Sequence, residues 1–279
     1  MAVVLITGCS SGFGYHASLT FARQGHDVFA TVRTLERAEP LHDAAKKENL
    51  ELHVLHLDVR DAESVDAAVN EVMERAGRID VCVNNAGIEV RGAIEDCSDD
   101  EMLVQFDTNV FGLVRMVRAV LPVMRAQGAG VIVNVGSLAG LVARPYGGLY
   151  SGTKHAVEAI SEALHFECAQ FGVRIAVMEP GQFETELANN AIIAARFDDS
   201  SRYKAASDRF DDALRRLVPD GKPAPPEVVA DAIVAVAEDD DAALRHLVGA
   251  DAELVWSVRS GSTFEQYEQT MRAALDWWE

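Results

Sequence analysis

Short apolar runs alternate with amphipathic helical segments along most of this chain. Apolar runs without polar alternation are typical of strands covered on both faces, as in parallel sheets. A repeating strand–helix–strand order requires right-handed crossovers, which place helices on both faces of such a sheet. We therefore predict an α/β protein with one domain, residues 1–279, built on a doubly wound parallel sheet of about seven strands. The predicted strands lie near residues 2–7, 26–32, 52–57, 79–83, 131–135, 173–178 and 245–249, and the predicted helices near 12–24, 61–75, 99–126 and 150–171.

Residues 182–226 break this alternation. The segment is polar in its middle, at residues 198–201, and proline-rich at its end. Doubly wound folds bind their ligands at the carboxyl edge of the sheet. We therefore interpret residues 182–226 as an insertion that forms a substrate loop over that edge.

The chain is strongly acidic, because 25 Lys and Arg residues stand against 44 Asp and Glu residues, a net charge of −19. This charge argues against nucleic acid and anionic membrane surfaces as partners. No stretch approaches the roughly 18 apolar residues of a membrane helix, and the N-terminus lacks the pattern of a signal peptide. The four cysteines form no CxxC pair and are expected to be free thiols in a reducing compartment. We expect a cytoplasmic protein without membrane insertion.

A glycine-rich turn, TGCSSGFG at residues 7–14, joins the first predicted strand to the first predicted helix. Glycines at positions 8, 12 and 14 allow the backbone to approach a pyrophosphate, which then lies at the positive end of the helix dipole. The spacing is GxxxGxG rather than GxGxxG. Such a loop can also be purely structural, but the strand–turn–helix context favours dinucleotide binding.

The residues at the end of the second predicted strand help to predict whether NAD or NADP is bound. A carboxylate about 20 residues past the glycines would bind the ribose hydroxyls of NAD. Val32 stands there instead, and Arg33 follows it. A guanidinium pairs well with a phosphate, so Arg33, aided by the Ser11 hydroxyl, predicts that NADP(H) is preferred over NAD(H). The alternative is an ordinary solvated arginine.

Tyr150 and Lys154 lie four residues apart in the helix near 150–171, and therefore on one helical face. A neighbouring ammonium favours the phenolate, which makes tyrosine usable as an acid or base near neutral pH. Ser137 follows the strand near 131–135, so its hydroxyl is expected at the same edge of the sheet. No metal site is predicted, because His53 and His56 lie on opposite faces of one strand.

These motifs resemble the short-chain dehydrogenase/reductase family over residues 2–252. TGCSSGFG resembles the family's TGxxxGxG turn, residues 84–87 read NNAG, and residues 180–185 read PGQFET. The sequence before Arg33 is most similar to the NADP-preferring hydroxysteroid and retinol dehydrogenases. Gly136, before Ser137, departs from the family pattern, and nothing in the sequence explains it.

The resemblance implies a Rossmann-like fold and hydride transfer with NADP(H). It implies that Tyr150 exchanges a proton with the substrate oxygen, while Lys154 lowers the pKa of Tyr150 and holds the nicotinamide ribose. Ser137 would orient the substrate, and Asn109 would hold a helix bend and a water of the proton relay. The cofactor residues that the turn, Arg33 and the resemblance together suggest are Gly8, Ser11, Gly12, Phe13, Gly14, Arg33, Asp58, Val59, Asn85, Lys154 and Thr185.

The expected substrate is a small hydrophobic ketone, aldehyde or secondary alcohol. It is preferred over a sugar nucleotide, because no convergent pair of arginines is evident to hold a substrate carboxylate or phosphate, with Arg144 as the one exception. Two alternatives remain open, a non-catalytic NADP(H)-binding redox sensor and an NAD(P)-dependent epimerase or dehydratase. The expected lining of the substrate pocket is Leu138, Leu141, Val142, Tyr146, Phe183 and Leu187.

Family members pair through the two helices predicted near 99–126 and 150–171, so a homodimer or homotetramer is expected. These helices carry apolar residues beyond one narrow stripe, namely Leu103, Val110, Val117, Ile160 and Leu164. Residues 253–279 form a C-terminal extension. Tyr267, Met271, Ala274 and Trp278 have helical spacing there and are expected to pack in a core or an interface.

Overall fold

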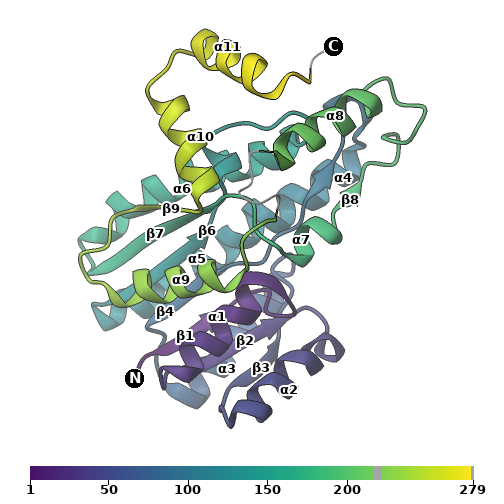
Figure 1. The fold of residues 1–279 in the computed structure, drawn as a ribbon. Coiled ribbons are helices and arrows are strands. Elements are labelled where there is room, and N and C mark those ends of the chain that lie inside the picture. Colours follow the sequence, from purple (N-terminus) through teal and green to yellow (C-terminus); the bar gives the residue numbers. More distant parts are fainter. Residues whose placement is uncertain (217–221, 278–279) are drawn as a thin grey trace.

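The computed structural model describes residues 1–216 and 222–277. Seven parallel strands form one sheet in the order β3-β2-β1-β4-β6-β7-β9 (Figure 1). The predicted single-domain, doubly wound parallel sheet is confirmed, and every predicted strand is present within about two residues. The strands are β1 Val3–Ile6, β2 Asp27–Val32, β3 His53–His56, β4 Val81–Asn84, β6 Gly130–Val135, β7 Val173–Pro180 and β9 Arg245–Val248.

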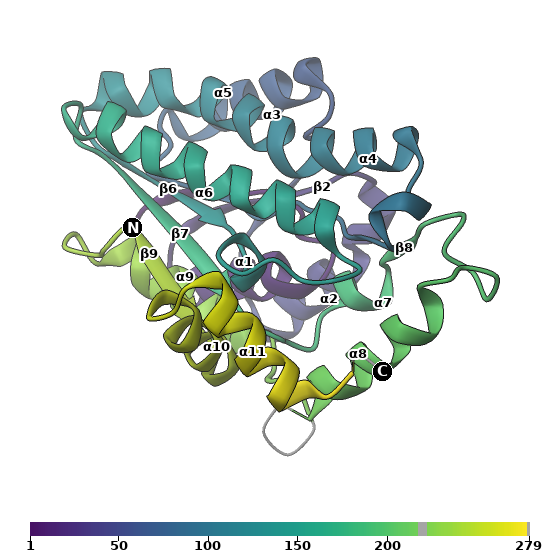
Figure 2. The same ribbon diagram turned by 90° about the horizontal axis from the view of Figure 1, so that it is seen from above.

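Helices cover both faces of the sheet, as Figure 2 shows. One layer contains α1 (Gly12–Arg23), α2 (Glu39–Glu48) and α9 (Glu227–Glu238). The other contains α3 (Ala62–Ala76), α5 (Gly112–Gln127) and α6 (Gly148–Ala169). The sequence analysis did not name α2 or α9 among its helices.

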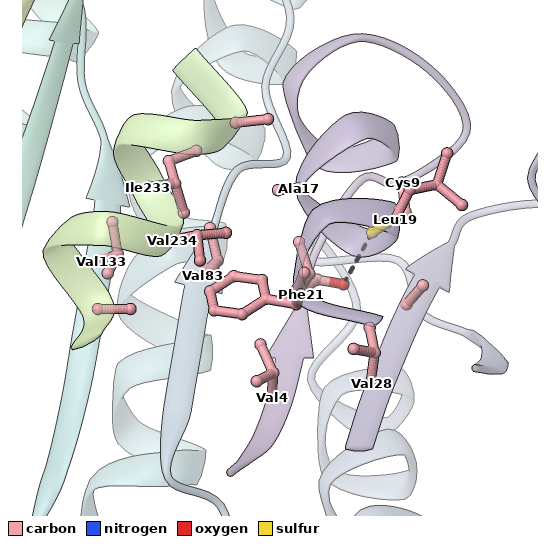
Figure 3. Packing of buried hydrophobic residues seen from close by; sticks show 14 of the residues in the cluster. Val4, Cys9, Ala17, Leu19, Phe21, Val28, Val83, Val133, Ile233 and Val234 are labelled. Atoms are coloured by element: carbon pink, nitrogen blue, oxygen red, sulfur yellow. Dashed lines mark hydrogen bonds between the residues drawn. The ribbon is translucent and has the colours of Figure 1, made fainter. Parts of the chain in front are cut away.

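Each helical layer buries its own apolar cluster against the sheet. Phe21 on α1 is fully buried in one cluster with Val4 and Val83 of the sheet and Val234 of α9 (Figure 3). On the opposite face, Met116 of α5 is fully buried in the second cluster. The free thiols of Cys9 and Cys82 belong to these two clusters. Strands covered in this way on both faces explain why their sequences are nearly all apolar.

The helix predicted over 99–126 is interrupted. It consists of α4 (Asp99–Phe106) and α5, joined by a π-helical turn over Asp107–Phe111. At the start of α4, Ser98 and Glu101 form a reciprocal capping box. Hydrophobic periodicity does not reveal the π-helical turn, because the turn spans only five residues between two segments of ordinary α-helical period. Such turns occur frequently at functional sites.

The remaining elements lie beyond the carboxyl ends of the strands (Figures 1 and 2). A short parallel pair joins β5 (Val90–Arg91) to β8 (Ile192–Ile193). The other elements are α7 (Glu186–Asn189), α8 (Lys204–Arg215), α10 (Ala250–Ser260) and α11 (Phe264–Leu275). Part of the predicted insertion, residues 217–221, and Trp278 of the predicted helical stripe lie outside the described residues. Among the residues described, no helix is both long and apolar enough to cross a membrane.

Candidate active site

A cavity of about 890 Å³ opens at the carboxyl ends of the strands and extends from the glycine-rich turn to α8 and α11. Because parallel strands end at one edge, residues distant in the sequence converge there. Gly14 and Asn109 are not among the residues that line it. The predicted site residues that line the cavity are Gly8, Ser11, Gly12, Phe13, Arg33, Asp58, Val59, Asn85, Ser137, Tyr150, Lys154 and Thr185.

The glycine-rich turn requires its glycines for two reasons. Gly8 and Gly12 have φ values of 73° and 59°, in the region that side chains disfavour. At Gly14 a Cβ atom would come within 2.4 Å of Asn85 Nδ2. Asn85 Nδ2 donates hydrogen bonds to Thr7 O at 2.8 Å and Gly8 O at 3.0 Å. Asn85 therefore braces the turn from β4, a role that only the tertiary structure reveals.

The turn leads directly into α1, whose N-terminal amides and dipole favour a bound anion. A Cβ atom at Gly12 would meet only Thr185 atoms, at 3.8 Å or more, so the space above the turn is open. An open backbone cradle at a helix N-terminus fits the pyrophosphate of a dinucleotide.

Three arginines line the cavity beyond β2: Arg33, Arg37 and Arg60. Val32, at the end of β2, is 1% exposed and offers no polar group. Arg60 Nη2 lies 2.6 Å from Asp58 Oδ2, and this pairing lowers the pKa of Asp58. The Asp58 carboxylate, one of the expected cofactor residues, is therefore already paired with Arg60. The sequence analysis overlooked Arg37, four residues after Arg33, and Arg60, two after Asp58.

Tyr150 and Lys154 are brought together near the start of α6, with Ser137 following β6. Lys154 Nζ lies 5.7 Å from the centre of the Tyr150 ring and donates a hydrogen bond to Val135 O at 2.7 Å. Lys154 is 6% exposed, and its burial lowers its pKa to about 8.

The pKa of Tyr150 is raised, chiefly by desolvation and also by the negative charge of Glu89. The Ser137 hydroxyl and Arg144 act in the opposite direction. The sequence analysis expected Lys154 to lower this pKa. In the structure the Lys154 ammonium donates to Val135 O instead. Of the two groups that lower the pKa of Tyr150, the Ser137 hydroxyl has the larger effect and Arg144 the smaller.

Asn109 lies in the π-helical turn and is 3% exposed. Its Oδ1 accepts a hydrogen bond from Ile88 N at 2.8 Å, and its Nδ2 donates to Ile88 O at 2.9 Å and to Thr153 Oγ1 at 3.1 Å. Asn109 therefore ties this turn to the loop after β4 and to α6, beside Lys154.

The apolar end of the cavity differs in part from the expectation. Leu138, Val142, Phe183 and Leu187 line it, whereas Leu141 and Tyr146 lie outside the lining. The Tyr146 ring instead packs against Phe197, Phe210 and Trp277. The helices α8, α10 and α11 add residues that the sequence analysis did not assign to the pocket, namely Phe210, Leu214, Val255, Tyr267 and Met271.

Two arginines do converge in the cavity, but on carboxylates of this chain. Arg91 Nε and Arg144 Nη1 both approach Glu89 Oε1, at 3.1 and 3.4 Å, and Arg144 Nη2 also pairs with Asp211 at 3.0 Å. All four residues line the cavity. Two arginines and two carboxylates balance in charge, so they form a neutral polar patch in a largely apolar cavity. Arg144 and Asp211 come from segments distant from Glu89 and Arg91, so the sequence does not reveal the group.

Comparisons with known proteins agree with this geometry. The model of the short chain dehydrogenase family matches residues 2–194. A 3-ketodihydrosphingosine reductase of Bacteroides thetaiotaomicron is 39% identical over 192 residues, which cover 69% of this chain and 68% of the relative. The uncharacterised oxidoreductase YusZ of Bacillus subtilis is 32% identical, with 98% of each chain covered.

A solved structure is similar over the same length. The crystal structure of a short-chain dehydrogenase from Streptomyces avermitilis has a TM-score of 0.79 and 34% identity, covering 98% of each chain. Family match, relatives and fold therefore agree: this chain is an oxidoreductase that belongs to the short-chain dehydrogenase/reductase family.

Proposed function

We propose that this oxidoreductase interconverts a hydrophobic ketone or aldehyde and its alcohol, using NADP(H), with Tyr150 as the general acid and base. The observation that carries the proposal is the convergence of Tyr150, Ser137 and Lys154 on one cavity whose far end is the glycine-rich turn. When bound, a nicotinamide dinucleotide supplies or accepts the hydride. The acid–base residues favour catalysis over the alternative of a non-catalytic sensor.

The chain's own residues would manage the proton. Tyr150 has a raised pKa and is a neutral phenol near pH 7, so it is ready to donate a proton to a carbonyl oxygen. Ser137 would hold that oxygen, and the charged Lys154 would stabilise the phenolate that forms. Asn109 would keep the neighbouring backbone in place through its bonds to Ile88 and Thr153.

Tyr150→Phe is expected to reduce turnover by roughly 10²- to 10⁴-fold, because general acid–base catalysis is lost. NADPH binding, measured by fluorescence titration, should change little, since the hydroxyl acts chiefly in the transition state. Tyr203→Phe is a matched control, because the Tyr203 hydroxyl donates to Glu95 on the surface. Unchanged turnover in Tyr150→Phe would exclude Tyr150 as the acid.

The pKa of Lys154, about 8, predicts how the reduction depends on pH. Values of kcat/KM for NADPH report the free enzyme. They should be level near neutral pH and fall above about pH 8, as Lys154 loses its charge. In Lys154→Arg the decline near pH 8 should vanish from the remaining activity, because a guanidinium stays protonated. A wild-type profile that is level through pH 9 would contradict the assignment.

The preference for NADP(H) rests on the cations beyond β2. Family members bind NAD(H) or NADP(H), so the choice depends on this chain's own residues. Arg33 and Arg37 line the cavity where the adenosine ribose would lie, and the buried Val32 supplies no carboxylate to its hydroxyls. A 2′-phosphate would match this charge.

Arg33→Ala is expected to weaken NADPH binding by roughly 10- to 150-fold, since a hydrogen bond to a charged group contributes on the order of 1.5–3 kcal/mol. NADH binding should barely change. Val32→Asp should shift the ratio of kcat/KM values toward NADH, because it adds an acceptor and repels the phosphate. Arg75→Ala on α3, which pairs with Glu71, is the control. A wild-type enzyme that favours NADH would refute the proposal.

We also propose a homodimer or homotetramer, although three of the residues expected at its interface are buried. Val110, Val117 and Leu164 pack in the chain's own core, at 5%, 5% and 9% exposure. Leu103 remains 58% exposed. Phe111 and Phe166, which the sequence analysis did not name, are 51% and 74% exposed in the same helical layer.

Light scattering at micromolar concentration should therefore give at least twice the chain mass of 30.2 kDa. Phe166→Asp should lower that mass, because it places a charge on the apolar surface. The control is Phe264→Asp, at a position 64% exposed outside this helical layer. A 30.2 kDa particle in the wild type would disprove the association.

A further inference from the structure

Two carboxyl groups, of Glu158 on α6 and Glu179 on β7, are buried together beneath the catalytic residues. Glu158 is 6% exposed and Glu179 is 1% exposed. Glu158 Oε2 accepts a hydrogen bond from Arg245 Nε at 3.0 Å. The other three carboxyl oxygens of the pair receive no hydrogen bond from any residue that the structure describes. Two ionised carboxylates in such a place would be very costly.

A single proton removes most of this cost. Buried carboxyl groups in contact cannot both ionise readily, so one keeps a proton and donates it to the other. Glu179 is the more deeply buried, and its Oε1 is 4.0 Å from Arg245 Nε. Burial and the adjoining Glu158 raise the pKa of Glu179. Glu179 is therefore the proton holder, whereas Glu158, bound to Arg245, keeps the charge.

The pair adjoins the catalytic residues through the backbone. Gly136 lies between Val135, whose carbonyl binds Lys154 Nζ, and Ser137. A Cβ atom at Gly136 would come within 3.2 Å of Glu158 Oε1 and 3.0 Å of Met178 O. The absence of a side chain at Gly136 therefore leaves space beside the Glu158 carboxyl group.

Glu158 also follows Lys154 by one helical turn, on the same face of α6. Its negative charge raises the pKa of Lys154 and so opposes the larger lowering caused by burial. The charged groups placed against Glu158 are Lys154 and Glu162 on α6, Glu179 on β7 and Arg245 on β9. Glu162 is 53% exposed and pairs with the outer side of Arg245.

We propose that Glu158 and Glu179 share one proton and act as a singly charged pair that keeps Lys154 in its ammonium form. Both are positioning residues, since they act through Lys154 rather than on the substrate. The inference rests on the proposed roles of Tyr150 and Lys154, but the charge of Lys154 can be measured without turnover.

The test follows lysine side chains by NMR. The chain has five lysines, and Lys154→Arg identifies the signal of Lys154. In the double variant Glu158→Gln/Glu179→Gln, the titration midpoint of Lys154 should fall by about one pH unit or more, because the adjoining negative charge is lost. In Glu179→Gln it should stay near the wild-type value, because a neutral amide can donate to Glu158 as the protonated acid does.

Two further variants keep the test decisive if the double variant folds poorly. In Glu158→Gln the charge moves to Glu179, so an intermediate fall is expected. Glu162→Gln is the matched control, since it removes an Arg245 partner two helical turns from Lys154 and should leave the midpoint unchanged. The proposal would be overturned if the titration midpoint of Lys154 fell as far in Glu179→Gln as in the double variant. It would also be overturned if the midpoint did not fall in Glu158→Gln or in the double variant.

The proton itself can be observed by infrared spectroscopy. A protonated carboxyl band should be present at neutral pH in the wild type and absent in Glu179→Gln. Its absence from the wild type would refute the shared proton.

The double variant should also change the pH dependence of kcat/KM for NADPH. The fall that the wild type shows above about pH 8 should begin at a lower pH in this variant. If Tyr150→Phe loses turnover but the titration midpoint of Lys154 is unchanged in the double variant, this inference alone fails. If the titration midpoint of Lys154 falls in the double variant while Tyr150→Phe stays active, the proposed function fails instead.

Discussion

Parallel hydrogen bonding between β1, β4 and β6 decides where chemistry can occur in this protein. Ile6 pairs with Val83, and Val83 pairs with Val133, so the three strands run in register toward one edge. The glycine-rich turn, Asn85 and Ser137 follow these strands directly. If any one of these strands were antiparallel, the residues at its carboxyl end would lie at the opposite edge of the sheet. The cavity therefore depends on pairing buried deep in the core.

Buried charge is the second constraint on the site. The chain carries a net charge of −19, yet cations gather along the cavity at Arg33, Arg37, Arg60 and Lys154. Local cations and the dipole of α1 can attract a dinucleotide despite the repulsion of the whole protein. Burial disfavours the charged form of Lys154 and lowers its pKa to about 8. The negative charge of Glu158 acts in the opposite direction and raises the pKa of Lys154.

The substrate end of the cavity depends on packing between distant segments. Phe210 of α8 and Trp277 after α11 lie against Tyr146, which has a φ of 58°. This aromatic cluster holds α8 and α11 together, and both helices contribute to the cavity wall. A polar patch around Glu89 interrupts the otherwise apolar surface. Substrate selection is therefore expected to depend on both kinds of contact.

The parallel sheet, the glycine-rich turn and the closeness of Tyr150 to Lys154 could be predicted from the sequence, because each depends on a few neighbouring residues. Apolar periodicity reports burial on both faces of a strand, and a spacing of four places Tyr150 and Lys154 on one helical face. The resemblance to a family then connected these local signals, and the family comparisons agree with it.

The partners of the buried charges follow from the tertiary structure alone. Arg144 reaches Glu89, and Glu158 adjoins Glu179, from segments that the sequence does not pair. Gly136 has no meaning in the sequence and becomes a space requirement once Glu158 lies beside it. The physical reason is that electrostatic and steric effects depend on distance in space, whereas sequence patterns record only distance along the chain.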